Sequence, residues 1–164
     1  MAGTAQARGT EEGDPRGIYA ILSLCNFVIG MGAFSLIGMI EPMSEALQAP
    51  VTSVAFLLTV YSIAYAVTSP VLVALTGRIG RRRVLSAGLA IFATATALAA
   101  LAPGMALLYP ARVAAAAGAG MVSPVALAIA AALAPPERRG RALSSVFLGI
   151  TLAQVAGVPV GSWL

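Results

Sequence analysis

The stretch Thr76-Gly77-Arg78-Ile79-Gly80-Arg81-Arg82-Arg83 decides the fold of this chain. It places four arginines within six positions, and a long apolar run lies on each side of it, over residues 51–75 and 84–101. A soluble core does not need this arrangement, whereas two membrane spans joined by a short loop must leave the charges of the loop in water. Arginine clusters beside membrane spans tend to stay in the cytoplasm, so this loop predicts the side of every other segment.

The composition predicts a membrane protein. Of the 164 residues, 59% are hydrophobic and 10% are charged, whereas a soluble domain carries about 25% charged residues. The long segments are apolar all round, as expected of helices in lipid or in a bundle core. The net charge of +4 comes from arginines between apolar segments rather than on one exposed face, which argues against a nucleic-acid partner. The lipid bilayer is therefore an expected partner.

The sequence lacks the side chains of the common catalytic and metal centres. It has no histidine, and Cys25 is its single cysteine, so histidine-based metal sites and triads are absent and no internal disulfide is possible. No Asp or Glu lies inside an apolar segment, so no carboxylate pair is available for acid–base chemistry. We therefore expect no enzyme activity, no metal and no cofactor.

Five apolar segments are long enough to cross the hydrocarbon, which takes about 20 helical residues. Residues 1–16 are small, polar and acidic, and they predict a disordered cytoplasmic tail. We expect an all-α membrane protein in which residues 17–164 form the transmembrane domain. The predicted spans cover residues 17–40, 51–75, 84–101, 105–133 and 142–164.

The charges alternate from one predicted loop to the next. The first loop has Glu41 and Glu45 and no base. The N-terminal tail, the second loop and the fourth loop together hold every arginine except Arg112. In a five-span chain these three segments lie on one side of the bilayer. The positive-inside rule then predicts a multi-pass plasma-membrane protein with its N-terminus in the cytoplasm.

Arg112 is the charged residue that lies inside a predicted span. It lies seven residues into the fourth span, roughly 10 Å deep at 1.5 Å per residue. A buried arginine in a membrane costs several kcal/mol unless it pairs, meets water or reaches the interface. Arg112 therefore serves the substrate or coupling pathway, or it anchors the span by reaching the outer face. Its guanidinium stays protonated, so it cannot itself carry a proton.

Two amides and two tyrosines complete the candidate pathway. Asn26 and Gln154 lie at similar depths near the middle of the membrane. They line one cavity, or they form interhelical hydrogen bonds worth about 1 kcal/mol or less. Tyr61 and Tyr65 are one turn apart and share a helix face, where they form an aromatic wall of a pocket or simply pack.

Prolines interrupt three of the predicted spans, at Pro70, Pro124 and Pro159. Each proline removes one helical hydrogen bond and frees the carbonyl four residues earlier, which for Pro124 is that of Gly120. In lipid, a freed carbonyl needs a partner from the protein or from a water-lined cavity. Such kinks are either part of a transport cavity or purely structural.

The arginine-rich loop over residues 76–83 follows a known pattern. The pattern is G-x-x-x-D-R-x-G-R-R, and Gly77 stands at the position of its Asp. Its matching residues are Arg78, Gly80, Arg81 and Arg82. The pattern belongs to the loop between spans two and three of the major facilitator superfamily, which this chain resembles.

Three further motifs follow in the order expected for that family. Arg112 and the glycines after it resemble the fourth-span motif, whose arginine is linked to proton coupling. Residues 135–142 resemble the loop between spans four and five. The fifth-span motif associated with antiporters is matched at Gly149, Gly157, Pro159 and Gly161. The whole pattern resembles the drug and sugar efflux branch, with its arabinose-type and chloramphenicol-type exporters.

The resemblance implies a secondary active transporter with twelve spans in two six-helix halves. This chain would then be an N-terminal fragment holding spans one to five, with the C-terminal spans missing. The implied activity is efflux of a small-molecule substrate, a drug or a sugar, by alternating access, with the proton as coupling ion. Residues 77–82 would form a cytoplasmic gating loop. The alternative is a small polytopic adaptor or assembly protein that is complete at five spans.

Overall fold

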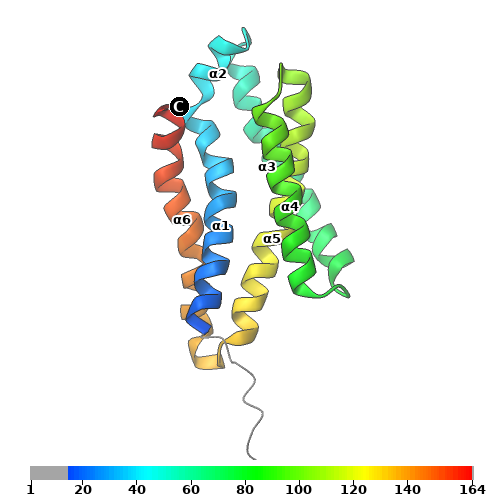
Figure 1. Cartoon of the computed structure of the whole chain (residues 1–164), viewed down its shortest axis with the longest axis vertical. Helices are drawn as coiled ribbons and strands as arrows, with labels where there is room; N and C mark the ends of the chain where they lie inside the picture. The colour runs from blue at the N-terminus through cyan, green and yellow to red at the C-terminus, as the bar shows by residue number, and fades with distance from the viewer. Residues whose placement is uncertain (1–14, 164) are drawn as a thin grey trace, which may run out of the picture.

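The computed structural model describes residues 15–163, and this range folds into a bundle of helices (Figure 1). Five of its helices are long and apolar enough to cross a membrane, which confirms the predicted all-α fold with five spans. The predicted tail lies outside the described residues except for Pro15 and Arg16, which begin the first helix. The helices are α1 (Pro15–Gly38), α2 (Ile40–Ala46), α3 (Val51–Thr76), α4 (Arg81–Ala100), α5 (Met105–Leu133), the short 3-10 helix η1 (Pro136–Arg138) and α6 (Arg139–Trp163).

The sequence reasoning did not predict α2. The pair Glu41-Pro42 predicts the end of the first span, but Pro42 lies in the first turn of α2. A proline is tolerated there because the backbone N–H that it lacks has no partner within the helix. The first span consequently ends at Gly38, and α2 lies between it and α3.

Besides α1, two spans begin earlier than predicted, because apolar patterning reports only the part of a helix inside the hydrocarbon. α4 begins at Arg81 rather than at residue 84, and α6 begins at Arg139 rather than at residue 142. The extra turns carry arginines out of the apolar region. α5 ends at Leu133, where Ala134 is extended, as expected of a residue that precedes a proline.

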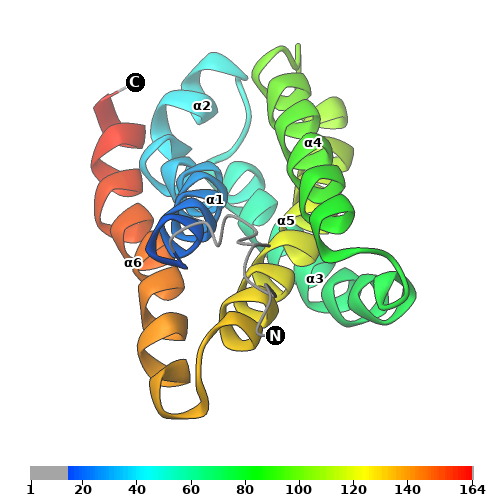
Figure 2. The ribbon, with the colours of Figure 1, turned by 60° about the horizontal axis from the view of Figure 1, so that its bottom comes forward.

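α1 and α6 pack along their length, side by side in both ribbon views (Figures 1 and 2). Gly149 lies against Ser23, and Gly161 lies against Ser35, so closely that a Cβ on either glycine would collide with the carbonyl oxygen of that serine. Both contacts advance in the same direction along the two helices, so α1 and α6 run parallel. Lipid gives helices little hydrophobic reason to associate, and small residues allow the close backbone approach that holds them together.

Two hydrogen bonds join α3 to α5. The Tyr109 hydroxyl donates to the Ser53 carbonyl at 3.4 Å, and the Ser69 hydroxyl donates to the Gly120 carbonyl at 3.1 Å. These helices also run parallel, because the second contact lies later on both. The Gly120 carbonyl is the one that Pro124 frees, so Ser69 is the protein partner that this proline kink requires.

α4 packs against α5 in the opposite direction. A Cβ on Gly88 would meet Val122 and the Gly118 carbonyl, and a Cβ on Gly118 would meet the backbone of Phe92. Residues that come later on α4 therefore contact residues that come earlier on α5. With α1 parallel to α6 and α3 parallel to α5, these contacts give the up-and-down threading of a membrane bundle.

The threading gathers the basic loops at one end of the bundle. The α3–α4 turn and the α5–α6 loop lie at the end where α1 begins, and α2 and the α4–α5 turn lie at the other end (Figure 1). Every arginine in residues 15–163 lies at the first end, except Arg112. α5 is the central helix, because 61% of its most apolar stretch is buried, compared with at most 28% in any of the other four spans.

The close contact between α1 and α6 gives a testable prediction about stability. In Gly149→Ala, the added methyl group collides with the Ser23 carbonyl oxygen, and overpacking of this kind costs about 1–3 kcal/mol. We expect a lower free energy of unfolding, measured by titrating the purified protein in mixed micelles with a denaturing detergent and following its circular dichroism.

Gly140→Ala is the matched control for this experiment. It adds the same group to the same helix at a position where no atom lies within 4 Å of the new Cβ. We expect Gly140→Ala to be at least as stable as the original protein. Equal stability of the two variants would contradict the described packing of α1 on α6.

Candidate functional site

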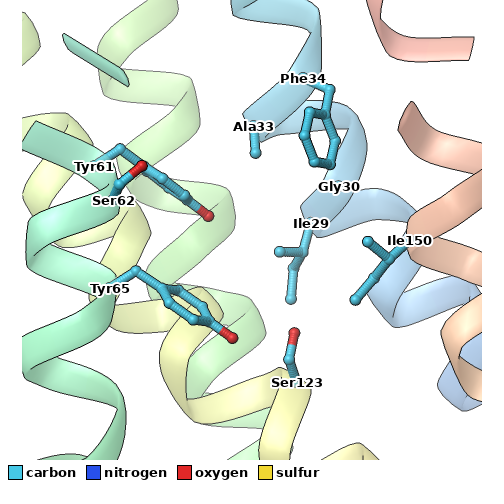
Figure 3. Close-up of a pocket in the computed structure, with 9 residues that line it drawn as sticks. All are labelled: Ile29, Gly30, Ala33, Phe34, Tyr61, Ser62, Tyr65, Ser123 and Ile150. Carbon is cyan, nitrogen blue, oxygen red and sulfur yellow. The ribbon is translucent and has the colours of Figure 1, made fainter. Parts of the chain in front are cut away.

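A cavity of about 260 Å³ lies between α1 and α3, about halfway along both helices (Figure 3). Four helices contribute to its wall, and apart from a few hydroxyl groups the wall is apolar. Small residues on α1 leave the space open. The lining residues are Ile29, Gly30, Ala33 and Phe34 of α1, Tyr61, Ser62 and Tyr65 of α3, Ser123 of α5 and Ile150 of α6.

Tyr61 and Tyr65 form the α3 side of the cavity. Their rings stack with centroids 6.4 Å apart and planes inclined by 21°. Both side chains point from α3 towards α1, with their hydroxyl groups in the space between the two helices (Figure 3). The predicted shared face of these residues is therefore the face that lines the cavity. Such a wall presents aromatic faces for stacking and two hydroxyl groups for hydrogen bonding.

Asn26 lies behind the cavity wall rather than in it. Its side chain is 1% exposed, and its Oδ1 accepts a hydrogen bond of 2.8 Å from the Ser123 hydroxyl. Its Nδ2 donates to the Leu22 carbonyl at 3.2 Å. Asn26 therefore holds the orientation of Ser123, and Ser123 presents its hydroxyl group to the cavity (Figure 3).

Ser123 was missed by the sequence reasoning. A hydroxyl residue directly before Pro124, at the depth of Asn26, was a usable signal. Gln154 lies elsewhere: it is exposed on α6, and Ile150, one turn earlier, is the α6 residue that lines the cavity. Small residues such as Ala153 occupy the buried side of α6 against α1, which turns Gln154 outward.

Arg112 reaches from α5 to the backbone of α1. Its Nη1 donates to the Gly32 carbonyl at 2.9 Å, and its Nε is buried with no hydrogen-bond partner. The acidic residues in the described range are on α2 and η1, outside the spans. The described residues thus give Arg112 no acidic partner inside the bundle.

The predicted gating loop joins α3 to α4. Gly77 follows the last residue of α3, and Gly80 precedes the first residue of α4. Arg78 and Arg82 are exposed, and the Arg81 Nη1 donates to the Ala128 carbonyl of α5 at 3.3 Å. This bond ties the loop to the central helix rather than leaving it free.

The residues of the fifth-span motif lie on α6. Gly149, Gly157 and Gly161 are buried, and a Cβ on Gly157 would meet the Phe34 side chain of α1. Pro159 is exposed on the same helix. The glycines of this motif therefore serve the packing of α6 on α1, and this packing holds Phe34 and Ile150 on one side of the cavity (Figure 3).

Comparison with known proteins confirms the family resemblance. The model of the Major Facilitator Superfamily matches residues 22–164. The chain is 33% identical over 141 residues to an uncharacterized MFS-type transporter of Bacillus subtilis, which covers 86% of this chain and 36% of that protein. It is also 33% identical over 141 residues to a chloramphenicol efflux pump of Mycobacterium tuberculosis, with 86% of this chain and 34% of the pump covered.

A third relative is the chloramphenicol resistance protein of Streptomyces lividans. It is 35% identical over 145 residues, which cover 88% of this chain and 37% of the relative. The chain thus spans little more than a third of the length of these curated relatives. A family model that matches nearly all of the helical region leaves no doubt about kinship: the chain belongs to the Major Facilitator Superfamily.

Proposed function

We propose that this chain forms part of the substrate pathway of a secondary active transporter that exports small molecules by alternating access. The observation that carries the proposal is the cavity among α1, α3, α5 and α6, with stacked tyrosines in its wall. A mid-membrane site between helices of a bundle is where such transporters hold their substrates. Efflux is supported by the relatives named as a chloramphenicol efflux pump and a chloramphenicol resistance protein.

The cavity lies between two closely packed helix pairs. α1 is packed firmly on α6, and α3 is packed on α5, whereas α1 and α3 contact each other little. Hydrogen bonds from Ser123 and Arg112 of α5 to α1 join the two pairs around the cavity. The further spans of a longer transporter, which the length of the relatives supports, would close the open side of the cavity.

The proton remains the proposed coupling ion, and the side chain that carries it must lie outside residues 15–163. Arg112 keeps its proton, and no Asp or Glu lies within α1, α3, α4, α5 or α6. A carboxylate outside residues 15–163 would therefore have to bind and release the coupling proton. The positive charge of Arg112 would then interact with the charges of the substrate and of the proton-carrying carboxylate, and Arg112 itself would carry no proton.

The end of the bundle that holds the arginine-rich loops faces the cytoplasm. Arginine in short loops next to membrane spans favours retention on that side, and both basic loops lie at one end (Figure 1). We accordingly propose a plasma-membrane protein with the acidic α2 end outside.

The first prediction of this proposal concerns the aromatic wall. Cells that express the complete gene are tested for resistance to a panel of antibiotics that begins with chloramphenicol. For any compound exported, Tyr65→Ala removes a stacking surface and is expected to reduce export about tenfold, which corresponds to about 1.4 kcal/mol.

Val67→Ala is the control for this variant, because Val67 lies on the same helix and is 60% exposed. It should leave export unchanged. If Tyr65→Ala exports every compound as well as Val67→Ala does, the cavity is not the substrate site. A panel in which expression protects against no compound would contradict the efflux proposal itself.

The second prediction concerns Arg112. Arg112→Ala removes the buried charge and its hydrogen bond to Gly32, and we expect export to fall to the background of cells without the gene. Quantitative immunoblotting of isolated membranes checks that the amount of protein is kept. Arg139→Ala, which removes an exposed arginine from the start of α6, should retain export. Full export by Arg112→Ala would remove Arg112 from the mechanism.

A further inference from the structure

We propose that the free edge of the Arg112 guanidinium is an anion-binding subsite of the cavity, and that the protein prefers aromatic carboxylates to neutral or cationic molecules of the same shape. The inference rests on the proposed function, because it takes the cavity as a place where small molecules bind. It adds the charge of the bound molecule, which the fold and the family do not give.

The first step is the unbalanced charge of Arg112. Its guanidinium is permanently cationic, and burial of an unpaired charge in a membrane is costly. The acidic residues of the described range, Glu41, Glu45 and Glu137, are exposed and lie outside the spans. A ligand that brings a negative charge into the cavity would compensate the charge of Arg112, and a cation would be repelled.

The second step is the geometry of the hydrogen-bond donors. Nη1 donates to the Gly32 carbonyl at 2.9 Å, and the buried Nε has no partner. Within residues 15–163, the hydrogen bond to Gly32 is the one that the Arg112 side chain forms. The edge formed by Nε and Nη2 therefore has no hydrogen-bond partner among the described residues. This edge can bind a carboxylate through two parallel N–H···O bonds.

The third step is the position of Arg112 beside the cavity. Its Nη1 is 2.9 Å from the carbonyl oxygen of Gly32, and Gly32 directly precedes Ala33, which lines the cavity together with Tyr61. Arg112 thus stands behind this wall rather than in it. A molecule whose ring lies against Tyr61 and Tyr65 can therefore direct a charged group towards Arg112.

A purely structural role for Arg112 leaves one feature unexplained. An arginine that only cross-links α5 to α1 would be expected to have its buried N–H groups satisfied, as buried polar groups generally are. Here the bond to Gly32 uses Nη1 and leaves the buried Nε without an acceptor. An anionic ligand would supply the acceptor that Nε lacks, and it would also compensate the positive charge of Arg112.

The test compares three probes that share a ring system and differ in charge. They are 2-naphthoate, 2-naphthamide and 2-naphthylmethylammonium. Their binding to the purified complete gene product in detergent is measured by isothermal titration calorimetry at pH 7 and constant ionic strength. We expect 2-naphthoate to bind at least tenfold more tightly than 2-naphthamide, and the ammonium probe to bind most weakly.

Variants at Arg112 assign the preference to its side chain. Arg112→Gln removes the charge and should bind 2-naphthoate and 2-naphthamide about equally. Arg112→Lys keeps the positive charge but cannot form the bidentate hydrogen bond, so it should retain a reduced preference for the carboxylate. Arg139→Gln, which removes an exposed arginine from the start of α6, outside the cavity lining, should keep the full preference.

Several results would overturn the inference. These are equal affinity for the three probes, binding of none of them, and a preference for the carboxylate that persists in Arg112→Gln. The original protein alone decides the first two, so they do not depend on the folding of a variant. An acidic side chain from outside residues 15–163 that already occupies the Arg112 edge would give the first result or the second.

Failure of this inference can be distinguished from failure of the proposed function. If cells export compounds of the antibiotic panel but the purified protein shows no charge preference, the anion subsite is wrong and the transport proposal stands. If the protein prefers 2-naphthoate through Arg112 but exports nothing, the subsite stands and the transport proposal is wrong.

Discussion

A charged side chain inside a membrane must be paired, hydrated or moved to the interface, and the organisation of this chain depends on that constraint. The arginines of the α3–α4 turn and of the α5–α6 loop lie at one end of the bundle. The helices α1, α3, α4, α5 and α6 contain no acidic residue. Arg112 is the exception to the placement of charges at the helix ends, and its Nη1 donates to the carbonyl of Gly32, which directly precedes the cavity residue Ala33. Arg112, the arginine that lies inside the bundle, thus marks the region where we propose that the protein binds its substrate.

The cavity exists because the spans pack unevenly. α1 and α6 approach through glycines, and α5 holds α3 through the Ser69–Gly120 hydrogen bond. α1 and α3 have few direct contacts, so space remains between them. The Asn26–Ser123 pair bridges α1 and α5 below this space. The packing of α1 on α6 and of α3 on α5, together with the Asn26–Ser123 hydrogen bond, therefore leaves a defined cavity between α1 and α3.

The spans could be predicted from the sequence because lipid imposes a minimum length of apolar helix. Their ends were less predictable. α2 was missed since Glu41-Pro42 resembles a stop signal, although a proline is acceptable in the first turn of a helix. The common face of Tyr61 and Tyr65 followed from the helical repeat, and this face does line the cavity.

Other parts of the site could not be predicted, because the rotation of each helix about its axis depends on its neighbours. Gln154 has the depth of Asn26, but the small residues of α6 that face α1 leave Gln154 exposed. The partner of Arg112 was equally hidden, since the Gly32 carbonyl is a backbone group without a signature in the sequence. The depth of a residue along a span can be predicted from the sequence, whereas the direction in which its side chain points depends on how the helices pack.

The central claim is that the bundle threads the membrane with its arginine-rich end in the cytoplasm. Thiol labelling tests it directly in the complete protein with Cys25→Ala, which removes the free cysteine. Ile79→Cys places a thiol between the arginines of the α3–α4 turn, and Gln48→Cys places one after α2 at the opposite end. A membrane-impermeant maleimide added to intact cells should label the Gln48→Cys protein and should label the Ile79→Cys protein only after the membrane is permeabilised. Ready labelling of the Ile79→Cys protein in intact cells would contradict the account.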